Sequence, residues 1–255
     1  MEYPATSKTL AYLACVAGSS LAVAYPMIRN EVEIVEGGAG TNESLVFFIL
    51  VVVAAAFMVM AIRMGLSHYL YVMTEYMSIL VLPFFVVTLV TSSLLLGAGA
   101  SIALLAAKLS ERWNMFPLFE SYVISVCIAS IMGITFAPVP LIVLLMLLSV
   151  YDIIAVKKTG YMKRLAEDVI ENRGPQMVTF SSRADEVSIG LADIIFPCAF
   201  AVSAAISASI YVGIAAILLS MAGLWIMFSR PSKEGMPALP YGSLGVAAYL
   251  LSLLA

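Results

Sequence analysis

Charged residues are scarce in this sequence. Its 255 residues include 13 Lys and Arg, 16 Asp and Glu and 1 His, so that 11% of the chain is charged, against roughly a quarter in soluble domains. Hydrophobic residues make up 62%, and the mean hydropathy is +1.04. A chain of this size folded in water would leave too much of that apolar surface exposed. A soluble globular domain, a disordered chain and a coiled coil are therefore excluded.

Two further scarcities narrow the function. The net charge of −3 and the pI of about 5.2 exclude nucleic acid as a partner, because such binding needs a basic surface. Cys15, Cys127 and Cys198 fall inside apolar runs, where we expect small buried residues rather than disulfides or metal ligands. His68 stands alone and cannot form a metal site. The sequence thus predicts no metal and no cofactor.

Long apolar runs are abundant, and they are continuous rather than alternating as in a membrane β-barrel. We therefore predict an all-α, polytopic membrane protein, in which each crossing takes about 20 residues. Two charge-poor stretches, 63–108 and 193–230, are too long for one crossing and are divided near 91–93 and 207–209. With the single crossings, nine transmembrane helices are predicted. The single crossings are 8–29, 43–63, 118–136, 140–156 and 237–255.

The basic residues test this count. With the N-terminus inside, all 13 Lys and Arg except Arg29 fall on the inner face, as the positive-inside rule requires. The N-terminus is predicted to be cytoplasmic and the C-terminus extracytoplasmic, in an integral protein of the cell membrane surrounded by lipid. Residues 1–156 then hold helices one to six, 157–188 a cytoplasmic loop, and 189–255 helices seven to nine.

Two parts of the chain keep open alternatives. Ala22-Val23-Ala24 after an apolar stretch also fits the cleavage site of a secretory signal peptide. In the loop 157–188, apolar residues at helical spacing favour an amphipathic helix on the inner membrane surface, although a solvated tether fits equally well. The segment 177–180 favours a short strand. The apolar residues of the loop are Met162, Leu165, Val169 and Ile170.

Three acidic residues fall within the predicted spans: Glu75, Asp152 and Asp193. An ionisable group in hydrocarbon costs about 2.5–3.5 kcal/mol on insertion scales, so each one indicates a functional site. No Lys or Arg lies inside a predicted span, and we therefore expect no intramembrane ion pair. Glu75 is isolated in its span and is expected to be a hydrogen-bonded or protonated packing residue.

Asp152 and Asp193 are predicted to share one depth. The first lies near the inner end of the sixth span and the second near the inner start of the seventh, within roughly two helical turns of the boundary. Two adjacent carboxyl groups in a low dielectric share one proton. The ionised group can take a proton from water while the protonated group donates one to a peptide carbonyl. The pair alone is compatible with an aspartic protease and with a proton-coupled transporter or ion pathway.

The residues around these acids carry a resemblance. Val150-Tyr151-Asp152, Gly190-Leu191-Ala192-Asp193 and Pro237-Ala238-Leu239-Pro240 stand on the sixth, seventh and ninth predicted spans. Together they resemble the presenilin/signal peptide peptidase family of intramembrane aspartyl proteases, with its Tyr-Asp, Gly-x-Gly-Asp and Pro-Ala-Leu signatures. The resemblance covers the whole chain in span count, and is strongest over 145–242. The short chain is most similar to a compact prokaryotic, archaeal-type presenilin homologue.

The resemblance implies that Asp152 and Asp193 are catalytic. Ala192 stands where the family has its second glycine, and is predicted to affect efficiency and specificity more than the chemistry. The implied substrate is a transmembrane helix, locally unwound, which could pair with a strand of the 174–187 region. A prepilin-type aspartyl peptidase remains an alternative, and homo-oligomerisation is left open. The residues implied to line the site are Tyr151, Gly190, Leu191, Ala192, Pro237, Ala238 and Leu239.

Overall fold

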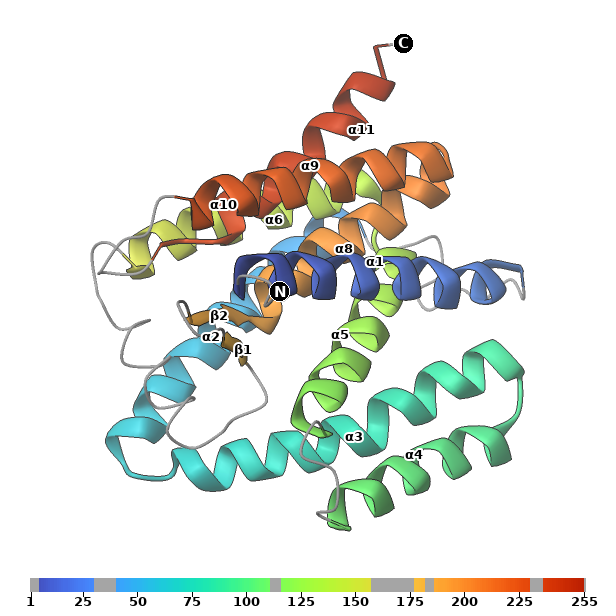
Figure 1. Cartoon of the computed structure of the whole chain (residues 1–255), viewed down its shortest axis with the longest axis vertical. Helices are drawn as coiled ribbons and strands as arrows, with labels where there is room; N and C mark the ends of the chain where they lie inside the picture. Colours follow the sequence, from blue (N-terminus) through green and yellow to red (C-terminus); the bar gives the residue numbers. More distant parts are fainter. Residues whose placement is uncertain are drawn as a thin grey trace.

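The chain folds as an α-helical bundle (Figure 1). The structure is a computed structural model that describes residues 5–29, 40–110, 116–156, 177–181, 186–229 and 236–254. Five of the described helices are long and apolar enough to cross a membrane: α1 (Ala5–Arg29), α2 (Thr41–Arg63), α3 (Ser67–Thr91), α5 (Phe116–Thr135) and α9 (Ile210–Phe228). Three apolar helices are shorter: α4 (Leu94–Leu109), α6 (Pro138–Ile154) and α8 (Leu191–Ser207).

The predicted spans are confirmed as helices, and the last one is subdivided. Within the described residues, the ninth span consists of α10 (Leu239–Gly242), a 3-10 turn η2 (Ser243–Gly245) and α11 (Val246–Ser252). Both predicted divisions are also confirmed. Ser92 adopts the left-handed conformation (φ 54°) that ends α3, and the Ser209 side chain caps α9 by accepting a hydrogen bond from the Val212 N–H.

Helix α8 lies at the centre of the bundle, with buried residues along most of its length. It packs against α1, α5, α6 and α9. Glycines on two neighbours let the backbones approach: a Cβ on Gly133 of α5 would lie 2.5 Å from the Val202 Cβ, and a Cβ on Gly213 of α9 would lie 2.6 Å from the Ala201 carbonyl oxygen. Small residues at helix contacts are typical of membrane bundles, where van der Waals packing supplies much of the association energy.

The break between α5 and α6 shows how a freed backbone group is satisfied. Pro140 has no N–H, so the Phe136 carbonyl lacks its helical partner four residues on. The Ser203 hydroxyl of α8 donates to this carbonyl oxygen at 2.7 Å. The hydrogen bond ties the start of α6 to the central helix.

A two-stranded antiparallel hairpin precedes α8. Strand β1 (Met177–Ser181) pairs with β2 (Glu186–Gly190) so that Val178 lies opposite Ile189. These two side chains and that of Phe180 are buried. The Phe180 ring packs against Tyr12 of α1, with 5.4 Å between ring centroids. The predicted strand at 177–180 is confirmed, whereas the amphipathic helix predicted at 162–170 lies outside the described residues.

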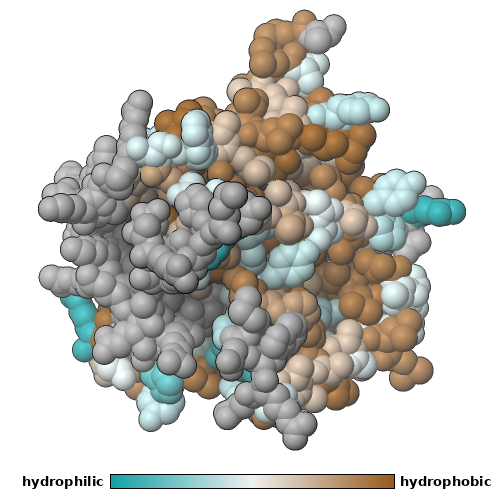
Figure 2. Space-filling view, in the orientation of Figure 1, coloured by the Kyte–Doolittle hydropathy of each residue, from teal (hydrophilic) through white to brown (hydrophobic). Residues whose placement is uncertain are grey.

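The surface of the described chain is largely apolar. Figure 2 shows brown, hydrophobic side chains over much of the visible face. On α2, Ile49, Val53, Phe57 and Met60 are each more than half exposed, as expected of a helix that faces lipid. Cys15 is also exposed, contrary to the expectation from its apolar run, while Cys127 and Cys198 are buried.

The expectation that the acids within the predicted spans form no ion pair is wrong for Glu75. Lys108, in the last turn of α4, contacts the Glu75 carboxylate of α3 and donates to both carboxylate oxygens of Glu120 on α5, at 3.1 and 3.3 Å. Its ammonium also lies 5.1 Å from the centroid of the Tyr76 ring. Glu75 is therefore paired rather than isolated. Glu120 is a fourth acid within the predicted spans, which the sequence-based count omitted.

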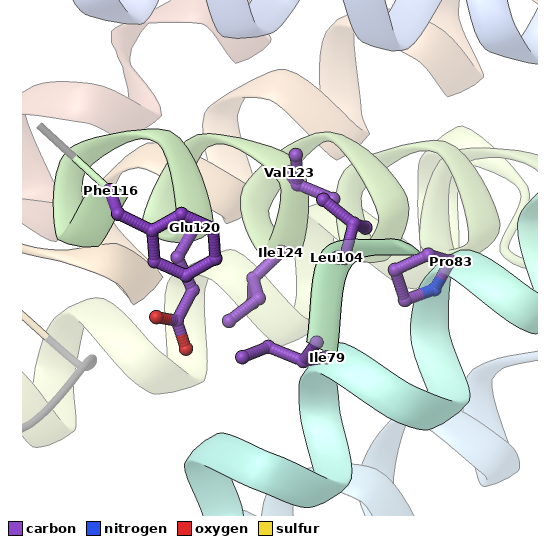
Figure 3. A pocket seen from close by; sticks show the side chains of 7 residues that line it. All are labelled: Ile79, Pro83, Leu104, Phe116, Glu120, Val123 and Ile124. Atoms are coloured by element: carbon purple, nitrogen blue, oxygen red, sulfur yellow. The ribbon is translucent and has the colours of Figure 1, made fainter. Parts of the chain in front are cut away.

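The geometry of the α3–α4 hairpin explains this error. The two helices run antiparallel (Figure 1), so the end of α4 lies beside the third turn of α3. A lysine side chain is long enough to extend back from a helix end. Figure 3 shows Glu120 at one end of a small pocket between α3, α4 and α5, whose other lining residues are apolar. The charge cluster thus joins three helices in a region of low polarity.

We expect Lys108→Met to lower the thermal stability of the protein in detergent. It would leave the buried Glu120 carboxyl group facing the half-buried Glu75 carboxyl group without a cation between them, and removal of one partner from a fully buried ion pair costs about 3–5 kcal/mol. Glu75→Gln is the matched control, because Lys108 still forms its ion pair with Glu120 in that variant. A melting temperature lowered no more by Lys108→Met than by Glu75→Gln would contradict the structural role of the cluster.

Candidate active site

Asp152 lies in the last turn of α6, two residues before its end, among the buried residues of that helix. Its Oδ2 accepts a hydrogen bond from the backbone N–H of Leu239 at 3.4 Å, and the Ala238 N–H is directed at the same carboxyl group. These two N–H groups stand at the start of α10, where a helix leaves its first backbone donors without internal partners. The Pro-Ala-Leu segment therefore meets Asp152 through its backbone.

Asp193 occupies the third position of α8, whose N-cap is Gly190. Its carboxyl group folds back toward the N-cap and lies beside Gly190. A Cβ built on Gly190 would lie 3.1 Å from Asp193 Oδ2, so a larger residue would crowd the carboxyl group. The glycine at this position therefore makes room for the aspartate of its own helix.

The two aspartates come together from consecutive spans. The carboxyl group of Asp152 lies close enough to that of Asp193 for their charges to interact. Helices α6 and α8 have only 17 residues each, a rise of about 26 Å, somewhat less than the roughly 30 Å of a hydrocarbon core.

The other residues predicted to line the site differ in how deeply they are buried. Tyr151 is half-buried next to Asp152. Leu191, Ala238 and Leu239 are buried, and so is Pro237. Ala192 is exposed. Its methyl group therefore does not crowd a neighbouring helix backbone, as it would if another helix packed at this position.

The contribution of backbone donors could not be found from side-chain motifs. The Leu239 N–H donates to Asp152, and Gly190 lies beside Asp193, but a sequence motif gives only the identities of these residues. The one available signal was the proline-rich start of the ninth span, since prolines there indicate irregular backbone near a polar site. Gly242 was also missed: a Cβ there would lie 3.0 Å from Pro197 Cγ, so the residue allows α10 to lie directly on α8.

This arrangement has the parts needed for general acid–base chemistry. As a general rule, two adjacent carboxyl groups in a low-dielectric site share a single proton, which gives one acid and one base. The Leu239 N–H fixes the orientation of the Asp152 carboxyl group. Within the described part of the chain, no group of three or more His, Cys, Asp and Glu is placed to hold a metal ion.

Comparisons with known proteins agree with this geometry. The family model described as signal-peptide peptidase, presenilin aspartyl protease matches residues 10–255. A search of curated proteins found no match. Two solved structures, both described as a presenilin family intramembrane aspartate protease, are similar in fold. The structure in space group C222 has 20% identity and a TM-score of 0.65, with 96% of this chain and 97% of that chain covered.

The structure in space group P2 has 23% identity and a TM-score of 0.67, with 96% of each chain covered. At these identities the structural similarity establishes the fold, and the family match, which spans nearly the whole sequence, establishes kinship. The helices that carry Tyr-Asp, Gly-x-x-Asp and Pro-Ala-Leu all fall within the matched residues. The chain belongs to the signal-peptide peptidase and presenilin family of intramembrane aspartyl proteases.

Proposed function

We propose that Asp152 and Asp193 are the catalytic pair of this protease, and that it hydrolyses peptide bonds within transmembrane helices. The proposal is supported by the position of the two aspartates on consecutive spans that pack against each other, Asp152 near the end of α6 and Asp193 at the start of α8, in a chain of this family. The hydrogen bond from the Leu239 N–H to Asp152 supports the proposal, because it joins the Pro-Ala-Leu motif to the Tyr-Asp motif.

The reaction needs one proton on the pair. The ionised carboxylate takes a proton from a water molecule while the water oxygen attacks the peptide carbonyl carbon. The protonated carboxyl group donates its proton to the carbonyl oxygen. A tetrahedral diol results. Its collapse breaks the C–N bond as the first carboxyl group returns its proton to the leaving nitrogen, and the second regains a proton from the diol. The pair ends in its starting protonation state, so no cofactor is consumed.

The substrate must be unwound before its backbone can reach the pair. A transmembrane helix keeps every carbonyl in an internal hydrogen bond, and freed backbone groups in hydrocarbon need new partners. In the described structure each strand of the hairpin pairs on one side only, and β2 leads directly into Gly190 and α8. An extended substrate segment added to this hairpin would recover backbone hydrogen bonds next to Asp193.

The charge distribution sets the side of cleavage. With the N-terminus in the cytoplasm, the end of α6 and the start of α8 face the cytoplasmic side of the cell membrane. Water and the released product would then exchange with the cytoplasm. The transporter and prepilin-peptidase alternatives draw no support from the family match, which names neither class.

Asp152→Asn and Asp193→Asn are each expected to abolish cleavage of a single-span substrate in detergent, measured as product formed per enzyme. Each removes one member of an acid–base pair, and such groups contribute about 10²–10⁴-fold to rate. Glu75→Gln is the matched control: it alters an acid outside the pair and is expected to leave most of the cleavage rate. Cleavage at the native rate by either Asn variant, or proton-coupled flux in liposomes with the substrate left intact, would refute the proposal.

Val178→Pro is expected to slow cleavage of a helical substrate several-fold, because proline removes a backbone donor from β1 and disturbs the hairpin. Thr179→Val is the matched control. It removes an exposed hydroxyl that lies 2.8 Å from that of Ser188, but keeps every backbone N–H. Equal turnover by the native and Val178→Pro proteins, both folded by thermal melting, would show that the hairpin does not bind substrate.

A further inference from the structure

Ser149 is a buried residue of α6 that the mechanism above does not use. It is 9% exposed, and its Oγ has no hydrogen-bond partner among the residues that the structure describes. A buried hydroxyl without a partner is unfavourable by about 1–3 kcal/mol. Such a group in a native protein indicates a missing partner, such as water or a ligand.

The conformation of Ser149 differs from that of four other buried helical serines, although Ser101 of α4 also has a buried hydroxyl without a partner among the described residues. A helical serine can satisfy itself by donating to the carbonyl four residues earlier. Ser20, Ser121, Ser125 and Ser130 all do so, at 2.7 to 2.9 Å. Ser149 has the same option with the carbonyl of Leu145, yet makes no such bond. Its hydroxyl is therefore left available for a partner from outside its own helix.

The position of Ser149 identifies the partner. It precedes Asp152 by three residues, so both side chains lie on one face of α6, the face that includes the buried Leu145 and Leu148. Helix α6 contacts α8 and α10, and it lies beside α10 in Figure 1. Ser149 therefore lies about 5 Å before Asp152 along the axis of α6. It is on the side of Asp152 that faces away from the nearby helix end, deeper in the bundle. In an extended peptide this distance corresponds to one or two residues.

We propose that the Ser149 hydroxyl binds the unwound backbone of the substrate, one or two residues from the scissile bond on its membrane-embedded side. This rests on the proposed function, because it places substrate at Asp152. Unwinding frees N–H and C=O groups that hydrocarbon cannot satisfy. The hairpin leads into the start of α8, whereas Ser149 lies on α6, and a hydroxyl can both donate and accept. Ser149 therefore completes the set of partners for the unwound segment.

Ser149→Ala provides the first test. The hydroxyl gains its partner only after the substrate unwinds, so its loss is expected to lower kcat about 3–10-fold, equivalent to one net hydrogen bond, with KM unchanged. The melting temperature of the unliganded variant should be unchanged or raised, because an unsatisfied polar group has been removed. Ser203→Ala is the matched control: its hydroxyl bonds to the Phe136 carbonyl, so its loss should lower the melting temperature.

A substrate ester scan locates the contact. Single amide-to-ester replacements near the scissile bond remove one N–H and weaken one carbonyl acceptor at a time. At one position within two residues of the scissile bond, the ester should slow the native enzyme but cause no further loss in Ser149→Ala. A native kcat in Ser149→Ala, a melting temperature lowered as in Ser203→Ala, or ester and alanine effects that add at every position would each overturn the inference.

The same experiment separates this inference from the proposed function. The native protein must cleave the all-amide substrate, and Asp193→Asn must not. Failure of that comparison would refute the catalytic pair, whatever Ser149→Ala does. If that comparison succeeds but the ester and alanine effects add at every position, only the role of Ser149 is refuted.

Discussion

The structure depends on one constraint: polar groups within this apolar bundle must find partners in the protein, because the bilayer offers none. Three contacts meet that constraint in three ways. Ser203 satisfies the Phe136 carbonyl at the break before α6. Lys108 neutralises charge between Glu75 and Glu120. The backbone N–H of Leu239 at the start of α10 is satisfied by Asp152. The last contact is also the candidate active site, so catalysis uses groups that the fold itself needs.

This dual use explains why the three motifs stand at helix ends. An aspartate in the middle of an apolar helix would meet no backbone donor, since all are used internally. At the third position of α8, Asp193 lies beside the N-cap residue Gly190, and near the end of α6, Asp152 accepts a hydrogen bond from the Leu239 N–H. The Leu239 N–H holds the Asp152 carboxyl group in place.

Much of this was predictable from the sequence, because helix length and charge placement in a membrane are tightly restricted. The divisions near Ser92 and Ser209 and the depth shared by Asp152 and Asp193 followed from those restrictions. The pairing of Lys108 with Glu75 and Glu120 did not follow, because it depends on the antiparallel packing of α3 on α4 and on the reach of one long side chain. The backbone contact of Leu239 and the unpaired Ser149 hydroxyl also require coordinates, since residue identity says nothing about a backbone donor or a rotamer.

The central claim is that Asp152 and Asp193 together hold the reacting water and peptide carbonyl. A structure of the protein bound to a peptide in which a hydroxyl-bearing tetrahedral isostere replaces the scissile amide tests it most directly. The account predicts that the isostere hydroxyl lies between the two carboxyl groups, within about 2.5–3.0 Å of an oxygen of each. A peptide bound with that hydroxyl near only one aspartate, or near neither, would contradict the account.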